Sequence, residues 1–176
     1  MTNKQKGFSL IELLIVVAII LIIAAIAIPN LLRSKMAANE ASAVGSIRAI
    51  TSTAIEYSSI YGIGYPGSLT AIGTTGTGAP SCANAELIDS VLTSGTKSGY
   101  TFTIIRGVVP VPSASVPSGC TGGFSDGYVV TATPVTVGTT GQRAFCSDAT
   151  GVIRANATGA VSYTSPLCTP TQTPLQ

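Results

Sequence analysis

The chain contains no histidine and no tryptophan, and only 9% of its 176 residues are charged. The missing histidine excludes Ser-His-Asp and Cys-His catalytic arrangements and removes the commonest protein ligand of metal ions. Soluble domains usually carry about 25% charged residues, and a cytosolic enzyme would lie closer to that figure. A surface with so little charge, filled by glycine, serine and threonine, is expected of a domain that is exported or that packs against copies of itself.

The charges that are present form no basic patch. Nine lysines and arginines are opposed by seven aspartates and glutamates, for a net charge of +2. Lys4 and Lys6 account for this excess, and both precede the first apolar run. Nucleic-acid sites need clustered positive charge, so the composition indicates no direct nucleic-acid site.

Polar side chains are absent from residues 13–28, which comprise twelve bulky aliphatic residues and four alanines. At roughly −0.3 to −0.6 kcal/mol per bulky residue, insertion of this run into a membrane is favourable by about 4–7 kcal/mol. Its sixteen residues span roughly 24 Å as a helix, and continuing to Leu32 covers a hydrocarbon core of about 30 Å. Because positive charge marks the cytoplasmic side, Lys4 and Lys6 predict that the N-terminal end stays in the cytoplasm.

Glu12 is a lone carboxylate in this segment, since Leu10 and Ile11 extend the apolar run on its other side. A carboxylate at the bilayer centre costs about 2.5–3.5 kcal/mol, so such a residue usually has a function. A secretory signal peptide, cut at Ala25-Ile26-Ala27, is one interpretation, but its apolar core would be shorter than this one. A plain signal anchor explains the length and leaves Glu12 without a role.

A third interpretation accounts for the basic start, the glutamate and the length together. The stretch K-G-F-S-L-I-E-L-L, residues 6–14, resembles the cleavage and methylation motif of type IV prepilins and type II secretion pseudopilins. The resemblance implies that a prepilin peptidase cuts after Gly7 and methylates the new N-terminus, Phe8, so that the apolar helix stays in the mature protein. It also implies that Glu12 pairs with the N-terminal amine of a neighbouring subunit, and this pairing in a low-dielectric helix bundle would fix the axial register.

The resemblance implies a type IV pilin: a structural subunit, not an enzyme, that polymerises through its apolar helix for adhesion, motility or DNA uptake. The expected partners are other pilin subunits, the prepilin peptidase, the inner-membrane assembly machinery and, before assembly, the membrane. The chain would start as a single-pass inner-membrane protein of a bacterium and end in an extracellular filament or a periplasmic pseudopilus. Two alternatives stay open: the major pseudopilin of a type II secretion system, and a membrane-anchored binding or enzymatic domain that does not polymerise.

Helical periodicity continues beyond the apolar run. The family's N-terminal helix often has a proline at the position of Pro29, where we expect a kink; a simple helix end is the alternative. Apolar residues at spacings of three and four then predict an amphipathic helix that packs under a head, with Arg33, Lys35, Glu40 and Arg48 on its polar face. This apolar stripe consists of Ala43, Ile47, Ile50, Ala54, Tyr57 and Tyr61.

The remainder of the chain, residues 62–176, is one domain by length and begins with a cluster of glycine and proline. Asn84 is expected to cap a short helix over residues 85–92. A hairpin turn is predicted at residues 148–151, a loop over residues 108–118 and a frayed tail after Cys168. Strands are predicted over residues 100–105, 128–137, 142–147, 152–155 and 160–163.

These elements predict an α+β fold, in which a long N-terminal α-helix packs against a C-terminal antiparallel β-sheet head. Its predicted organisation is a leader peptide of residues 1–7, the helix over residues 8–61 and the head over residues 62–176. Within the helix, residues 8–32 form the part that lies in the membrane or the filament core.

All four cysteines lie in the part expected outside the membrane, at Cys82, Cys120, Cys146 and Cys168. Their spacings contain no close pair, which argues against a zinc site, and two disulfides are the default in an exported domain. From the residues alone, three pairings are possible. Type IV pilins often close a C-terminal loop with a disulfide, so the resemblance favours Cys82–Cys120 with Cys146–Cys168.

No cofactor or metal is expected. Some pseudopilins bind calcium in a head loop, but Glu86, Asp89, Asp126 and Asp148 do not follow a D-x-D-x-D spacing. Turn and capping roles explain Asp126 and Asp148 more simply. Asn156-Ala157-Thr158 matches the N-glycosylation pattern, which by itself is weak evidence.

Overall fold

The computed structural model describes residues 9–74, 76, 79–107, 120, 127–164, 166–169 and 172–175. Its contacts divide the chain into two compact units, Met1–Lys35 and Met36–Gln176. Gly7, Phe8, Asp126 and the loop predicted over residues 108–118 lie outside the described residues.

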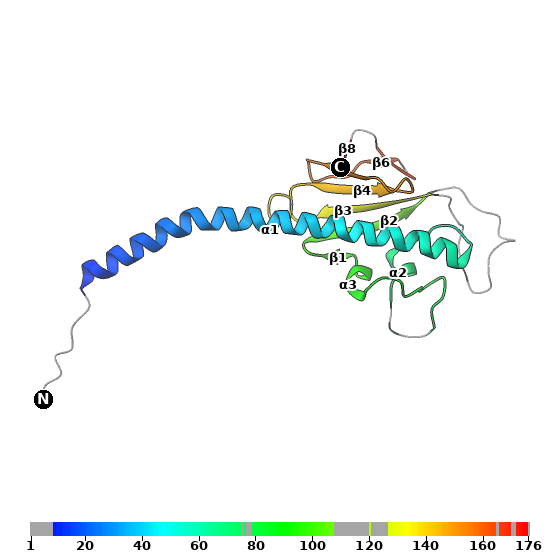
Figure 1. The fold of residues 1–176 in the computed structure, drawn as a ribbon, viewed down its shortest axis with the longest axis horizontal. Helices are drawn as coiled ribbons and strands as arrows, with labels where there is room; N and C mark the ends of the chain where they lie inside the picture. Colours follow the sequence, from blue (N-terminus) through cyan, green and yellow to red (C-terminus); the bar gives the residue numbers. More distant parts are fainter. Residues whose placement is uncertain are drawn as a thin grey trace, which may run out of the picture. The chain divides into compact units, whose positions relative to one another are not determined.

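The long helix α1 runs from Leu10 to Tyr61 and includes Pro29 (Figure 1). A proline removes one hydrogen bond of the helix, and the bonds of the remaining turns still hold it. The alternative in which the helix ends at Pro29 is therefore wrong, and the kink stays a prediction. Gly62 ends α1 with φ of +63°, a left-handed conformation that glycine adopts without strain, and its N–H donates to the Ser58 carbonyl at 3.0 Å.

Six antiparallel strands form the main sheet, in the order β1-β2-β3-β4-β5-β8 (Figure 1). The long helix and this sheet confirm the predicted α+β class. A separate two-stranded ladder joins β6 (Tyr163–Thr164) to β7 (Leu167–Cys168). The strands of the main sheet are β1 (Thr96–Lys97), β2 (Tyr100–Arg106), β3 (Tyr128–Pro134), β4 (Ala144–Asp148), β5 (Ile153–Asn156) and β8 (Thr173–Pro174).

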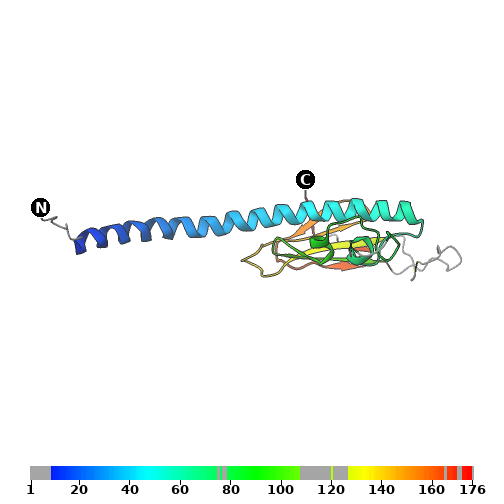
Figure 2. The same cartoon turned by 90° about the horizontal axis from the view of Figure 1, so that it is seen from below.

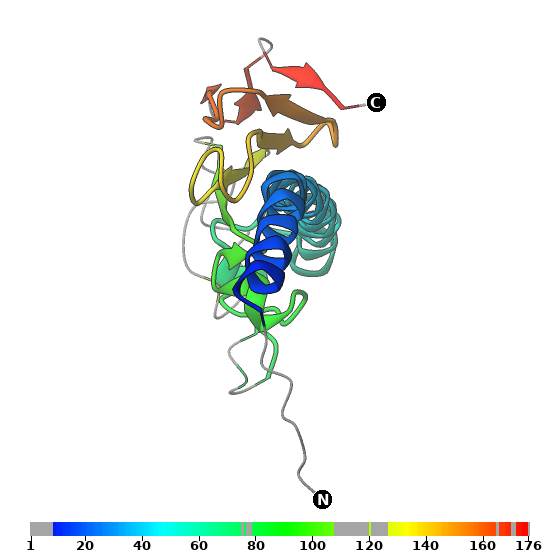
Figure 3. The ribbon, with the colours of Figure 1, turned by 90° about the vertical axis from the view of Figure 1, so that its left-hand side faces the viewer.

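The core of the second unit lies between the C-terminal half of α1 and one face of the sheet, which extends along one side of the helix (Figures 2 and 3). On the sheet, Phe102, Ala132 and Phe145 occupy paired register positions of β2, β3 and β4, and all three are buried. The predicted stripe of α1 is confirmed: its first five residues are buried and Tyr61 packs against them. Each large side chain buried here contributes about 1.5–3 kcal/mol to holding helix and sheet together.

The head has two four-residue helices, α2 (Leu69–Ile72) and α3 (Ser90–Thr93). The helix predicted over residues 85–92, with Asn84 as its cap, is therefore wrong except near its C-terminal end. Residues 85–88 are instead non-helical, and their backbone N–H groups donate to carbonyls of α2 and the glycine that follows it at 2.8–3.0 Å. Because these amides have partners elsewhere, the helix begins later, and Asp89 caps it by accepting from the Leu92 N–H at 2.9 Å.

The end of the chain departs from the predicted frayed tail. β8 pairs with the edge of β5, and the Leu175 N–H donates to the Ile153 carbonyl at 2.8 Å. An uncovered edge would leave backbone groups of β5 without partners, and the tail supplies them. The strand predicted over residues 160–163 is also displaced, to Tyr163–Thr164, where it pairs with β7.

Two strands of the sheet are shorter than predicted. β3 stops at Pro134: the N–H of Val135 still donates to the Gly99 carbonyl at 2.9 Å, but the chain then turns, and the N–H of Thr140 donates to the Thr136 carbonyl at 2.9 Å. β4 begins at Ala144, because the N–H groups of the two preceding residues bind a carboxylate of α1. The hairpin turn predicted at residues 148–151 is confirmed by a 2.9 Å hydrogen bond from the Gly151 N–H to the Asp148 carbonyl.

Two disulfides close loops of the head. The structure joins Cys82 to Cys120 and Cys146 to Cys168, which are the pairs that the resemblance implies. Their Cα–Cα distances are 5.4 and 6.1 Å, within the usual range for a disulfide. Closing a loop of 22 residues, as Cys146–Cys168 does, stabilises the folded chain by about 3 kcal/mol in the chain-entropy account.

We expect peptide mass spectrometry of unreduced, alkylated protein to find Cys82 linked to Cys120 and Cys146 linked to Cys168. Reduction should then lower the free energy of unfolding by about 3 kcal/mol or more, because each bridge restricts the unfolded chain. A Cys146→Ser, Cys168→Ser double variant is the matched control for the second bridge. Four alkylated thiols in the unreduced sample, or a link between Cys120 and Cys146, would contradict the pairing.

Candidate assembly segment

The N-terminal part of α1 has an apolar surface. No described residue of the same unit covers it. Its large aliphatic side chains, from Leu10 to Leu32, are 46–79% exposed. Among the described residues, α1 is the one helix long and apolar enough to cross a membrane, and none of its most apolar window is buried. A monomeric soluble protein rarely exposes more than a few hundred Å² of contiguous apolar surface. This surface therefore needs lipid or another protein chain to cover it.

Glu12 lies in the first turn of this exposed helix and caps it. The backbone N–H of Ser9 donates to Oε2 of Glu12 at 2.9 Å, and the Leu13 N–H donates to the Ser9 carbonyl at 3.2 Å. This is the reach-back bond of a capping box, and the positive end of the helix dipole also favours a carboxylate there. The sequence interpretation missed this role, although the Ser-x-x-Glu spacing ahead of an apolar run indicates it.

The second oxygen of Glu12 keeps its capacity for another donor. Oε1 accepts no hydrogen bond from any residue that the structure describes, whereas Oε2 is occupied by Ser9. A carboxylate can accept several hydrogen bonds. Capping and pairing with an external amine are therefore compatible. Gly7 and Phe8 lie outside the described residues, so cleavage and methylation stay predictions.

A second carboxylate of α1, Glu40, binds the helix to the sheet. Its Oε1 accepts from the backbone N–H groups of Gln142 and Arg143 at 2.9 and 3.0 Å. Its Oε2 accepts from Nε and Nη2 of Arg143, both at 2.8 Å. The placement of Glu40 on the polar face was wrong: it is buried, because it precedes Ala43 by three residues and Ile47 by seven, on the face of the apolar stripe.

The partners of Glu40 favour its charged form. Burial by itself raises the pKa of this carboxyl group, but the N–H groups of Gln142 and Arg143 and the Arg143 guanidinium outweigh burial, so the pKa lies below its ordinary value. The guanidinium also lies over the ring of Phe145, 5.6 Å from its centroid, in a cation–π contact. Arg143 is thus held from two sides, and Glu40 stays ionised at neutral pH.

Two further polar contacts adjoin this ion pair. Nδ2 of Asn39 donates to the Thr140 carbonyl at 2.8 Å, and the hydroxyls of Ser42 and Ser98 are 2.9 Å apart. We call Asn39, Glu40 and Ser42, with their partners in the turns between strands, the polar latch. It fixes the second half of α1 to the turns that connect β1 to β2 and β3 to β4.

Tyr57 and Tyr61 pack in the core as predicted. Their ring centroids are 4.8 Å apart, and the Tyr57 hydroxyl donates to the Cys82 carbonyl at 2.7 Å. Burial raises the pKa of Tyr57, and the neighbouring Tyr61 adds to that effect. Burial also raises the pKa of Tyr100 to about 12, and its hydroxyl donates to the Arg143 carbonyl at 2.7 Å. These hydroxyls therefore stay protonated and act as structural donors.

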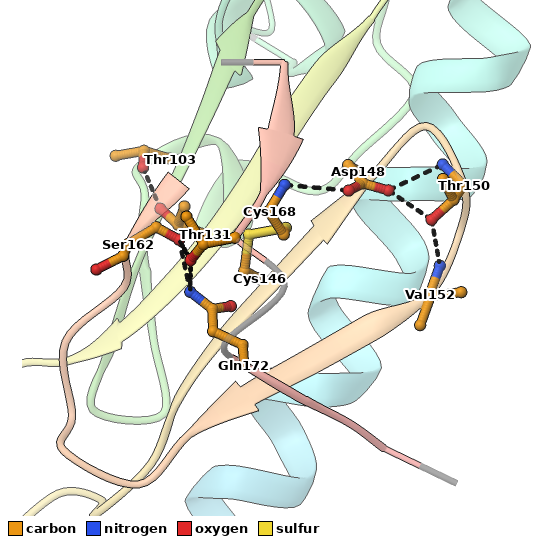
Figure 4. Close-up of a disulfide and its surroundings, with 10 residues drawn as sticks. Thr103, Thr131, Cys146, Asp148, Thr150, Val152, Ser162, Cys168 and Gln172 are labelled. Atoms are coloured by element: carbon orange, nitrogen blue, oxygen red, sulfur yellow. Dashed lines mark hydrogen bonds between the residues drawn. A yellow bond between two sulfur atoms is a disulfide. The ribbon is translucent and has the colours of Figure 1, made fainter. Parts of the chain in front are cut away.

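Asp148 connects the hairpin turn to the C-terminal disulfide (Figure 4). Its Oδ1 accepts from the N–H of Thr150 at 3.0 Å and from the Thr150 hydroxyl, and its Oδ2 accepts from the N–H of Cys168 at 3.1 Å. Both oxygens of this buried carboxylate are thus engaged, and its predicted turn role is confirmed. In the part of the chain that the structure describes, no three His, Cys, Asp or Glu side chains gather as a metal site would require.

Comparison with known proteins matches the N-terminal segment to a family model and the chain to two relatives. The prokaryotic N-terminal methylation motif matches residues 2–28. The chain is 31% identical over 99 residues to the type II secretion system core protein G of Escherichia coli (strain K12), covering 56% of this chain and 63% of that protein. It is 44% identical over 61 residues to the type IV wide pilus major component PilA4 of Thermus thermophilus, covering 35% of this chain and 44% of that protein. The matches thus span less than two thirds of either relative, and no solved structure matches the chain.

The methylation motif and both relatives make this chain similar to type IV pilins and type II secretion pseudopilins, and the exposed apolar helix agrees with that similarity. One relative is a component of a pilus and the other of a secretion system.

Proposed function

We propose that this chain is the subunit of a type IV pilus filament and polymerises through α1. The observation that carries the proposal is the exposed apolar surface of residues 10–32, with the carboxylate of Glu12 at its start. Before assembly, lipid covers this surface. In the filament, the same surfaces of neighbouring subunits replace lipid. The free energy of apolar contact changes little in this exchange, because lipid tails are as apolar as leucine.

Apolar contact alone does not fix the axial position of one subunit relative to its neighbour. A polar contact therefore sets this register. After a prepilin peptidase has cut behind Gly7, the methylated amine of Phe8 remains a cation in the membrane. Oε1 of a neighbour's Glu12, which accepts no hydrogen bond from the described residues, is its complement. In a medium of low dielectric constant, an unpaired amine and an unpaired carboxylate are each costly, so the paired arrangement is preferred.

The head forms the outer surface of the proposed filament, and the polar latch and the core hold it on the second half of α1. The buried stripe supplies the apolar part of this attachment, and Glu40 with Arg143 supplies the directional part. Inner-membrane assembly machinery would extract the subunit from the membrane and add it to the fibre. Adhesion, motility and DNA uptake are the activities that such a fibre would serve.

A second candidate is the major pseudopilin of a type II secretion system. The longer match, 99 residues against 61, is to the secretion-system protein and favours this candidate. The higher identity, 44% against 31%, is to the pilus component and favours the pilus. The structural features above are compatible with either filament.

Shearing of cells tests polymerisation, and deletion of the gene tests the kind of filament. We expect sheared supernatants to contain fibres built of this chain, and the deletion strain to lack surface fibres. Chain found only as membrane-bound monomer would contradict polymerisation. Normal fibres together with lost secretion of exoproteins in the deletion strain would instead identify the pseudopilin.

A further inference from the structure

We propose that Asn156 is an N-glycosylation site, whose Nδ2 receives a sugar from a lipid-linked glycosyl diphosphate on the side of the membrane where the head lies. The inference goes beyond filament assembly, because it concerns a covalent modification of the head and requires only that the head is exported. Asn156 is the only asparagine in the sequence that is followed by serine or threonine at the second position, with alanine between them.

The sequon lies in an open turn at the end of β5. Asn156 is the last residue of that strand, and Ala157 and Thr158 are exposed. On one side Asn156 pairs with Ala144, and on the other side the described pairs of β8 are with Arg154 and Ala155. The exposed residues Ala157 and Thr158 therefore give a transferase access to this turn.

Hydrogen bonds fix the orientation of the Asn156 carboxamide. Its Oδ1 accepts from the backbone N–H of Thr158 at 3.0 Å and from the Thr158 hydroxyl at 2.9 Å. A backbone N–H only donates, so the atom that faces it must be the oxygen, which decides the assignment of the amide. Because the carboxamide is planar, Nδ2 points away from the turn. Among the described residues, no hydrogen bond uses Nδ2 as a donor.

The transfer balances without an oxidant or reductant. Nδ2 forms a bond to the anomeric carbon of the sugar while the bond from that carbon to the diphosphate oxygen breaks. The lipid diphosphate leaves with the electron pair, and Nδ2 gives one of its two protons to a base of the transferase. Thr158 acts as a positioning residue, because its hydroxyl holds the carboxamide in place. A sugar here would add hydration to a chain with only 9% charged residues.

Peptide mass spectrometry of protein from its native cells tests the site. We expect the peptide that contains Asn156 to be heavier by one or more sugar residues. The added mass should disappear in Asn156→Gln and Thr158→Ala and persist in Thr158→Ser, which keeps the hydroxyl. Thr158→Ala keeps the backbone N–H of the turn, and an intact Cys146–Cys168 link in each variant would show that the head still folds.

Bare Asn156 in the wild-type protein, or added sugar that persists in Thr158→Ala, would overturn the proposal. The test is independent of filament assembly. Sheared fibres in which Asn156 carries no sugar would contradict the glycosylation and leave the filament proposal intact. A glycosylated Asn156 in a chain that forms no fibres would contradict the filament proposal and leave the glycosylation intact.

Discussion

Replacing Glu12 with glutamine is expected to reduce the fibre recovered from sheared cells by at least roughly tenfold, while the chain still inserts into the membrane. Loss of an ion pair worth about 1.4 kcal/mol changes an association equilibrium tenfold, and a pair in a low-dielectric bundle is worth at least that much. Insertion should persist, because removing a charge from an apolar segment makes insertion more favourable. Immunoblots of sheared supernatant and of the membrane fraction measure the two quantities separately.

Glutamine also separates the two roles of residue 12. Its amide oxygen can still accept the Ser9 N–H, so Glu12→Gln keeps the helix cap and loses the charge, whereas Glu12→Ala loses both. If pairing dominates, the two variants should assemble equally poorly. Glu56→Gln is the matched control, since Glu56 is an exposed acid on the same helix. Wild-type amounts of fibre from Glu12→Gln would exclude charge pairing and leave capping as the role of this residue.

Replacing Glu40 with glutamine is expected to lower the free energy of unfolding by about 2–4 kcal/mol at neutral pH. The variant weakens four hydrogen bonds of the polar latch, and the backbone N–H groups of Gln142 and Arg143 lose their charged acceptor. The loss stays below that of a fully buried pair, because the Arg143 side chain is 47% exposed and water can solvate it. Denaturant titration of the full chain in detergent, followed by tyrosine fluorescence, measures the change.

The same variant should change how stability depends on pH. The pKa of Glu40 in the folded chain lies below its ordinary value of 4.5, so the folded state binds this proton less readily than the unfolded state. Its contribution is therefore present above about pH 4.5 and is lost as the pH falls through the folded-state pKa. The difference between wild type and Glu40→Gln should shrink in acid. Glu86→Gln, at an exposed residue of the head, is the control, and a difference of equal size at all pH values would contradict the role of the ion pair.

The parts of the fold that could be predicted from the sequence depend on local periodicity. The apolar run, the stripe from Ala43 to Tyr61 and the turn at Gly151 follow from the spacing of side chains or from short-range turn chemistry. The prediction over residues 85–92 failed because that segment satisfies its amides on α2, a partner that sequence spacing does not reveal. Thr173–Pro174 became a strand for a similar reason, since only the folded sheet creates the edge that it covers.

The features of the candidate site also fall into those that local sequence predicts and those that only the folded head reveals. The proposed roles of Gly7, Phe8 and Glu12 could be predicted because these residues lie in one short contiguous motif. The burial of Glu40 was also readable, as it lies three residues before the stripe begins at Ala43. Its partner was not, because Arg143 is more than a hundred residues away in sequence and meets Glu40 only across the folded head.

The most direct test of the account is the N-terminal residue of the mature protein. In the proposed pathway the apolar helix is retained and becomes the assembly surface. Purification from the outer surface of native cells, followed by mass spectrometry of the N-terminal peptide, should find a chain that begins at Phe8 with a methyl group on its amine. A mature chain that begins at Ile28, after Ala25-Ile26-Ala27, would show that the helix is a discarded secretion signal and would contradict the account.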